Sequence, residues 1–364
     1  MSRAVVAAVA TLVAGGIAAG LVLAFGSSSS ARWVLDDLGT LPGYTECLPV
    51  AMNDGGQIVG SCNRGVVQSG FLWQGGKMVG LGQGVVPTAL NSRGQVVGRG
   101  PKRAFLWQHG RITWLGPSGS RSSAEAINDH GQVAGVVWRR DGGHVVLWQG
   151  VKAIELGVLG EPSAINARGE VVGVGTGADP HAGEAFLWQS GKTIDLGPFN
   201  LNSESIAVND AGQVVASGAD GAFLWQNGKF VYFGGGLGDG LAIDDRGQIL
   251  LGAGFGSDKH NDAYLWERGK LTLLPHFGRH RATFASTMNS RGQVIGWSLL
   301  SIGRPLPFVW QKGQKMVALP TLKAGSGAPY TYAAAINDGG EIAGYGYVLV
   351  NGHTQQHVVL WERH

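Results

Sequence analysis

The sequence predicts an all-β fold, a β-propeller of eight four-stranded blades closed by the N-terminal strand, and three observations predict it. A turn-like motif recurs eight times, a tryptophan motif recurs eight times beside it, and a strand-like segment that the last repeat lacks stands before the first. Glycine supplies 62 of the 364 residues, well above its usual share of roughly 7%. With only 13 prolines and 44% hydrophobic residues, the chain is neither collagen-like nor disordered.

The first 31 residues differ from the rest of the chain. After a single arginine in the first three positions, residues 4–25 carry no charge, and small residues follow. This is the order of a secretory signal peptide, with Ser29 and Ala31 at the −3 and −1 positions of a cleavage site. The apolar run is also long enough to span a bilayer as a helix. A cleaved signal and a retained anchor that tethers the protein through residues 4–25 both remain open, and either predicts an exported domain over residues 32–364.

The turn motif is an asparagine with a glycine three residues later, as in Asn53 and Gly56. It recurs at Asn91, Asn128, Asn166, Asn209, Asp244, Asn289 and Asn337. We expect a hairpin turn, because Asn bonds its own following backbone and Gly adopts a positive φ. Calcium binding is the functional alternative, but the alternating Asp spacing of calcium loops is absent.

The second motif reads Ala-Phe-Leu-Trp-Gln in its clearest form. Its tryptophans are Trp73, Trp107, Trp148, Trp188, Trp225, Trp266, Trp310 and Trp361. They span 288 residues in seven intervals, a mean spacing of about 41 residues. We expect these large rings to pack between neighbouring blades as structural residues. A ring of ligand-binding aromatics is the alternative interpretation.

Each repeat holds four short β segments, the fourth of the form Ile-Asp-Leu-Gly. The last repeat lacks this segment because the chain ends at His364, just after Trp361, whereas residues 34–39 carry the same pattern at the other end. An N-terminal strand that completes the C-terminal repeat is how a ring of repeats closes. Four strands in about 40 to 45 residues, with turn glycines and a tryptophan, are typical of a propeller blade. An open β-solenoid would leave the completing strand unexplained.

Residues 33–364 resemble the HAF-repeat family, extracellular repeat proteins named for a His-Ala-Phe step before the tryptophan. The resemblance implies an exported, β-rich repeat protein and no settled biochemical activity. His144 and His357 fill the histidine position here. The other repeats depart from it with Ser69, Arg103, Glu184, Gly221, Asp262 and Leu306. These departures exclude a ring of histidine ligands.

Cys47 and Cys62 are the only cysteines, and both belong to the first repeat. Folding that repeat about its turn places them on neighbouring strands, opposite each other or one position apart. In an oxidising compartment we expect a disulfide. A metal pair or redox dithiol fits less well, because the spacing is not Cys-x-x-Cys.

One face of the predicted propeller carries nearly constant tight turns and the other carries loops of varied length. Function usually resides in varied loops held on a rigid scaffold. A basic, aromatic ligand site is therefore predicted at His276, Arg279, His280, Arg281, Tyr330 and Tyr332. The alternative is that exposed loops collect such residues anyway. Zinc at two of these histidines is disfavoured, since an i,i+4 pair needs a helix to face one way.

No nucleophile elbow, P-loop or zinc-protease motif is present, and no cofactor or metal is expected. The net charge of +3 is too small to indicate nucleic-acid binding. We therefore expect an exported, non-catalytic binding or surface-interaction module whose partner is an extracellular glycan or protein. The alternatives are a polymer-degrading hydrolase or lyase that uses the same face, and a self-associating surface-layer protein. Paired carboxylates in a cleft on the loop face would favour the enzyme.

Overall fold

A computed structural model describes residues 32–176, 183–197, 206–218, 221–234, 240–252, 262–278, 282–301, 304–322 and 330–364. The predicted N-terminal signal or anchor helix, within residues 1–31, lies outside the described residues. Every regular element in the described ranges is a β-strand, which confirms the all-β class. None of the described residues forms a helix that could cross a membrane.

The strands follow the sequence repeats. Before the first repeat comes β1 (Trp33–Gly39). The first two repeats hold β2 (Glu46–Met52), β3 (Ile58–Arg64), β4 (Val67–Gln74), β5 (Lys77–Gln83), β6 (Val86–Leu90), β7 (Val96–Arg99), β8 (Ala104–Gln108) and β9 (Arg111–Leu115). The next two hold β10 (Ser122–Ile127), β11 (Gln132–Arg139), β12 (Gly142–Gln149), β13 (Lys152–Ile165), β14 (Val171–Thr176), β15 (Gly183–Gln189) and β16 (Lys192–Asp195).

The second half of the chain continues in the same way. The fifth and sixth repeats hold β17 (Ile206–Val208), β18 (Val214–Gly218), β19 (Gly221–Gln226), β20 (Lys229–Tyr232), β21 (Gly240–Ile243), β22 (Ile249–Leu251), β23 (Tyr264–Glu267) and β24 (Lys270–Leu273). The last two hold β25 (Thr283–Met288), β26 (Gln293–Ser301), β27 (Arg304–Gln311), β28 (Val317–Ala318), β29 (Thr331–Ile336), β30 (Ile342–Val350) and β31 (His353–Arg363).

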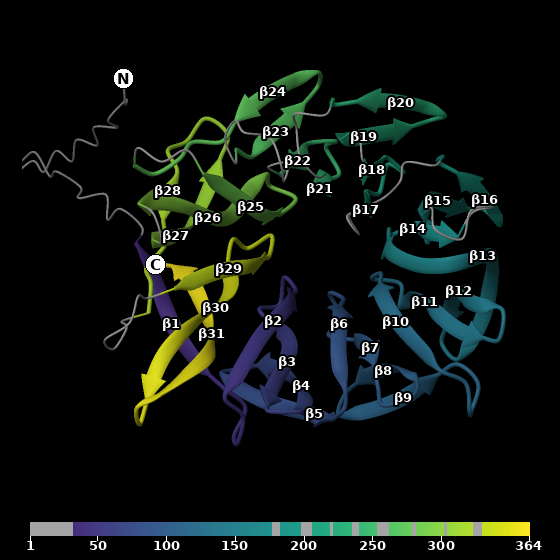
Figure 1. Cartoon of the computed structure of the whole chain (residues 1–364), viewed down its shortest axis with the longest axis horizontal. Coiled ribbons are helices and arrows are strands. Elements are labelled where there is room, and N and C mark those ends of the chain that lie inside the picture. Colours follow the sequence, from purple (N-terminus) through teal and green to yellow (C-terminus); the bar gives the residue numbers. More distant parts are fainter. Residues whose placement is uncertain are drawn as a thin grey trace, which may run out of the picture. The chain divides into compact units, whose positions relative to one another are not determined.

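Neighbouring strands pair antiparallel in chain order, and four of the sheets have four strands each. The long β13 serves two repeats, which joins β10–β16 into a seven-stranded sheet. A single parallel bridge between Glu46 and Gln356 joins the last repeat to the first. Figure 1 shows the sheets side by side around a common axis, with β2, β6, β10 and β29 innermost. This is the architecture of a β-propeller.

The repeated asparagine shapes its own turn, as predicted. The Oδ1 atom of Asn53 accepts the backbone N–H groups of Gly55 and Gln57 at 3.1 and 3.0 Å, and Gly56 adopts a φ of 70°. The side-chain amide then donates to the backbone of the next repeat, at the carbonyl of Asn91, 2.9 Å away. Six other turn asparagines donate the same side-chain hydrogen bond to a backbone carbonyl of the neighbouring repeat: Asn91, Asn128, Asn166, Asn209, Asn289 and Asn337. These bonds tie neighbouring repeats together beside the axis.

A β-bulge interrupts each innermost strand three residues before the turn asparagine or aspartate, except in β17. The unpaired residues are Val50, Thr88, Glu125, Ser163, Leu241, Ser286 and Ala334. Opposite most bulges stands a glycine of the second strand, because a Cβ there would lie 2.0–2.3 Å from a carbonyl oxygen of the innermost strand. These glycines are Gly60, Gly98, Gly135, Gly173, Gly296 and Gly344. A bulge changes the direction in which a side chain points. Here the bulged residue of the innermost strand, next to the axis, has no pairing partner on the second strand.

The hydrophobic core lies between successive repeats. Trp148 of the third repeat is fully buried in a cluster that contains Val97, Ala104 and Leu115 of the second. Trp361 is also fully buried, and its indole N–H donates to the carbonyl of Pro320 at 2.7 Å. Each such contact buries apolar surface from two repeats at once, so the repeats stabilise one another.

The two ends of the described chain meet in the last repeat. The strand β1 pairs antiparallel with β31, from Trp33 opposite Arg363 to Gly39 opposite Val358. Beside this junction Cys47 and Cys62 face each other in register and form a disulfide, which confirms the predicted pairing.

Candidate functional site

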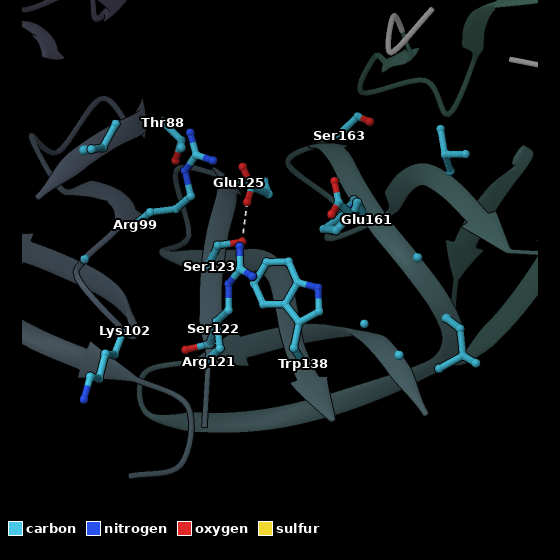
Figure 2. Close-up of a pocket in the computed structure, with 18 of the residues that line it drawn as sticks. Thr88, Arg99, Lys102, Arg121, Ser122, Ser123, Glu125, Trp138, Glu161 and Ser163 are labelled. Atoms are coloured by element: carbon cyan, nitrogen blue, oxygen red, sulfur yellow. Dashed lines mark hydrogen bonds between the residues drawn. The ribbon is translucent and has the colours of Figure 1, made fainter. Parts of the chain in front are cut away.

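A cavity of about 1380 Å³ opens on the axis, and four successive repeats, from β2 to β15, form its walls (Figure 2). It lies at the end of the innermost strands that is opposite to the asparagine turns. Four of its lining residues are bulge residues, one from each repeat: Val50, Thr88, Glu125 and Ser163. The bulge therefore presents a different side chain to the cavity in each repeat, on an otherwise constant backbone.

Glu125 is the only acidic residue among the bulge residues of the described strands. It is half-buried and accepts a hydrogen bond from the hydroxyl of Ser123, which is itself buried. Burial raises the pKa of the Glu125 carboxyl above its usual 4.5. The Ser123 hydrogen bond and the Arg99 cation lower it in part, and the Glu161 carboxylate raises it further. Figure 2 shows Glu161 on the neighbouring innermost strand, facing the same cavity.

Three cations line the cavity with these carboxylates. The guanidinium of Arg121 lies over the ring of Trp138, with its central carbon 4.5 Å from the ring centroid. Arg99 on β7 and Lys102 in the following loop are exposed. With Glu125, Glu161 and the exposed Asp141, the wall holds three positive and three negative groups. Such a mixed wall suits a ligand that is rich in hydroxyl groups and carries some anionic groups.

The predicted site belongs to later repeats than those that line the cavity. Arg279, His280 and Arg281 are outside the described residues. His276 is half-buried in the loop after β24, and Tyr330 and Tyr332 belong to the last repeat. None of the three described residues lines the cavity.

Tyr332 instead stacks on Tyr345, with ring centroids 5.3 Å apart, and meets Trp297 edge-on at 6.2 Å. Burial first, and then the neighbouring tyrosines, raise the pKa of the Tyr332 hydroxyl.

Sequence reasoning missed Glu125 because it sits inside the repeated motif, in Ala-Glu-Ala-Ile-Asn, and not in a variable loop. A signal was present. The residue three before the asparagine changes from valine to threonine, glutamate and serine over the first four repeats, while the alanine after it stays constant. A residue type that varies between repeats inside an otherwise constant strand indicates a side chain that is not fixed by the packing of the repeat and that can face a binding surface.

The opposite end of the axis offers less chemistry. A cavity of about 420 Å³ there is lined by the asparagine turns and their neighbouring aspartates. Those aspartates are already engaged, as Asp129 is when it accepts the N–H of Ser92 at 2.8 Å. In the described part of the chain, no three His, Cys, Asp or Glu residues are grouped to hold a metal ion.

The two histidines that stand shortly before a repeated tryptophan, His144 and His357, contact carboxylates of the outermost strand. His357 Nδ1 lies 2.9 Å from an Asp37 oxygen, and His144 Nδ1 lies 3.8 Å from Glu155. Nε2 of His144 also lies 3.0 Å from Asp141. These histidines therefore link strands within a repeat.

No protein-family model matches the chain, and no curated protein sequence matches it. Among solved structures it is similar to an oligogalacturonate lyase in complex with manganese, at 10% identity and a TM-score of 0.52, over 92% of this chain and 94% of that one. It is also similar to dipeptidyl peptidase 4 from Porphyromonas gingivalis, at 11% identity and a TM-score of 0.53, over 80% of this chain. The match spans only 56% of that peptidase.

A third similar structure is the β-propeller domain of the Trilobed protease from Pyrococcus furiosus, at 9% identity and a TM-score of 0.48, over 89% of this chain and 96% of that domain. At identities this low, the likeness to the lyase and to the peptidase shows the fold alone.

Proposed function

We propose that the protein is an exported β-propeller that binds an extracellular glycan bearing carboxylate groups in its axial cavity. The observation that carries this proposal is the grouping of Arg99, Arg121 and Trp138 with Glu125 and Glu161 around one concave space. Guanidinium groups grip carboxylates through paired hydrogen bonds, and carboxylates accept hydrogen bonds from sugar hydroxyls. A walled cavity fits a chain of sugar rings better than the broad surface of a protein partner.

Two features support export. The disulfide between Cys47 and Cys62 belongs to oxidising compartments, and residues 1–31 have the composition of a signal peptide or anchor. The resemblance to the HAF-repeat family points the same way, and we propose membership of that family.

We further propose that the strands form eight four-stranded blades in a ring that β1 closes. The antiparallel pairing of β1 with β31 supports this arrangement, as does the contact of β1 residues Trp33 and Leu35 with the core of the last two repeats. Deleting residues 33–41 should therefore leave the last blade with three strands and lower the melting temperature severely. A truncated chain that melts with the intact domain would contradict ring closure.

Glycan cleavage is a second candidate, and the pair of Glu125 and Glu161 favours it. A carboxyl with a raised pKa can donate a proton to a leaving group, while a second carboxylate acts as base or nucleophile. The two carboxyls face one cavity, and repulsion from Glu161 contributes to the raised pKa of Glu125.

Calorimetric titration of residues 32–364 with oligogalacturonates and with neutral cello-oligosaccharides tests binding. The variant Arg99→Ala/Arg121→Ala should weaken oligogalacturonate binding at least about tenfold, a loss of about 1.4 kcal/mol at 25 °C. Arg93→Ala is the matched control, because Arg93 is an exposed arginine on the opposite, turn-bearing end. If neither sugar series binds the intact domain, the proposed function is wrong.

The same preparations separate binding from cleavage. New reducing ends, or the ultraviolet absorbance of unsaturated products, would report turnover. If turnover occurs and Glu125→Gln abolishes it without weakening binding, the protein is a glycan-cleaving enzyme. Binding without turnover leaves the binding module.

A further inference from the structure

Five aromatic side chains form a continuous row on the last two repeats, away from the residues that line the cavity. The row runs through Phe284, Trp297, Tyr332, Tyr345 and Tyr347. Successive ring centroids are 3.9, 6.2, 5.3 and 6.4 Å apart, alternating between stacked and edge-on contacts. All five residues are half-buried, so each keeps part of its surface accessible.

The repeat pattern places this row at the same end of the axis as the cavity. The backbone N–H of Tyr347 donates to the carbonyl of Tyr330 at 3.2 Å, just as that of Trp138 donates to Arg121 at 2.9 Å. Tyr330 and Tyr347 therefore occupy the positions in the last repeat that Arg121 and Trp138 occupy in the third.

A second equivalence gives the same result. Trp297 and Tyr345 directly follow the bulge-facing glycines Gly296 and Gly344, as the cavity residue Arg99 follows Gly98. The position of Arg99 in the second repeat thus carries Trp297 in the seventh and Tyr345 in the eighth, and the position of Arg121 in the third carries Tyr330 in the eighth.

The chemistry of the row differs from that of the cavity. It contains no charged group, but it offers flat ring faces together with three tyrosine hydroxyls. A pyranose ring presents an apolar C–H face and a rim of hydroxyls, which match an aromatic face and a tyrosine hydroxyl.

We propose that the aromatic row is a second subsite for the same glycan, stacking pyranose faces while the cavity grips carboxylates. This inference rests on the proposed function, because the cavity supplies the first subsite. A glycan long enough to reach both would bind more tightly than a short one, since the second contact forms within the complex.

Calorimetric titration with oligogalacturonates of increasing length, from the dimer upward, tests the subsite. Affinity of the intact domain should rise with chain length. Trp297→Leu and Tyr345→Leu should reduce affinity for the longer chains at least about fivefold, corresponding to about 1 kcal/mol at 25 °C, and leave the shortest chains unchanged. Trp297→Phe, which keeps an aromatic face, should retain most of the gain with length.

The controls separate this inference from the proposed function. Arg99→Ala should weaken binding at every length, and Tyr232→Leu, an aromatic change on the outermost strand β20, should have no effect. Melting temperatures of all variants are compared, and Trp297→Phe reports on the site if the leucine variants are unfolded.

Three results would overturn the subsite. If Arg99→Ala binds the oligogalacturonates weakly while both leucine variants bind oligogalacturonates of every length with normal affinity, the row is not a subsite. The proposed function then stands. If the leucine variants alter the sedimentation of the protein but not its glycan binding, the row contacts a second copy of the chain. If no oligosaccharide binds the intact domain, the proposed function and the subsite both fail.

Discussion

The side-chain amide of Asn337 donates a hydrogen bond to the carbonyl oxygen of Asn53, 3.2 Å away and 284 residues earlier in the chain. It is the same bond that Asn53 makes to Asn91, and it joins the last repeat to the first. One link of the series is different, because Asp244 has no amide to donate. Its carboxylate instead accepts hydrogen bonds from the guanidinium of Arg246, at 2.9 and 3.1 Å.

The inter-repeat bonds can be separated from the turn that each asparagine forms. Asn91→Asp keeps the Oδ1 atom that accepts the N–H groups of Arg93 and Gln95. It removes the amide that donates to the Asn128 carbonyl and to Oε1 of Gln95. Asn91→Ala removes all of these bonds. We expect Asn91→Asp to lower the free energy of unfolding by about 1 kcal/mol, and Asn91→Ala by about 2–3 kcal/mol. Urea denaturation measures both, and an Asn91→Asp variant as stable as the wild type would mean that the inter-repeat bond contributes nothing of its own.

The contact between Asp37 and His357 should make the junction of β1 with β31 sensitive to acid. Burial raises the pKa of Asp37, but the His357 hydrogen bond, the Gly39 N–H and the His357 charge outweigh it and lower the pKa below its usual 3.8. A carboxyl with a lowered folded-state pKa stabilises the fold above its unfolded-state pKa, and that stability is lost as the pH falls through the folded-state value.

Asp37→Asn should therefore unfold at lower urea than the wild type at about pH 7, and the two should converge as the pH falls below 3.8. The difference should stay under about 1 kcal/mol, because Asp37 is 40% exposed and solvent screens the pair. A gap that is constant over the whole pH range would show that the charge of Asp37 plays no part.

Much of the fold is readable from the sequence because its determinants are local. The Asn-to-Gly spacing specifies the hairpin turn, the tryptophan spacing gives the repeat length, and residues 34–39 match the strand missing from the last repeat. The disulfide followed from counting along one hairpin. Each of these depends on residues close in sequence, or on a pattern that the chain repeats.

The candidate site was not readable in the same way. Which residues face the cavity depends on a one-residue slip between strands, and a slip reverses the side that a side chain faces. Glu125 thus looks like one residue of an ordinary alternating strand. The basic cluster around His276 was favoured because loops were expected to carry function, whereas the cavity is built largely from strand residues of the first four repeats.

The glycines opposite the bulges make a sharp test of that geometry. A Cβ on Gly135 would lie 2.2 Å from the carbonyl oxygen of Ser123 and 2.4 Å from the Trp148 ring, so Gly135→Ala should cost more than about 2 kcal/mol of unfolding free energy. The fifth repeat provides the control. There Ala216 naturally occupies this position opposite β17, where the pairing has no slip, and Ala216→Gly should cost about 1 kcal/mol or less. If Gly135→Ala is tolerated, close approach of the bulge is not why glycine stands there.

Glu125 should cost the protein stability at neutral pH. Its pKa is raised above 4.5, chiefly by burial, so ionisation is less favourable in the folded state and stability falls as the pH rises through the folded-state pKa. Glu125→Gln carries no charge at any pH and can still accept the Ser123 hydroxyl. Its melting temperature should therefore exceed that of the wild type at about pH 7, and the difference should close below pH 4.5.

Glu161→Gln, an exposed change on the same cavity, should shift stability by less than about 0.5 kcal/mol. Melting curves across this pH range measure both variants. A Glu125→Gln variant less stable than the wild type at neutral pH would show that the carboxylate is a structural group. A more stable one would mark Glu125 as a residue kept at a cost in stability, which is the pattern expected of a functional site.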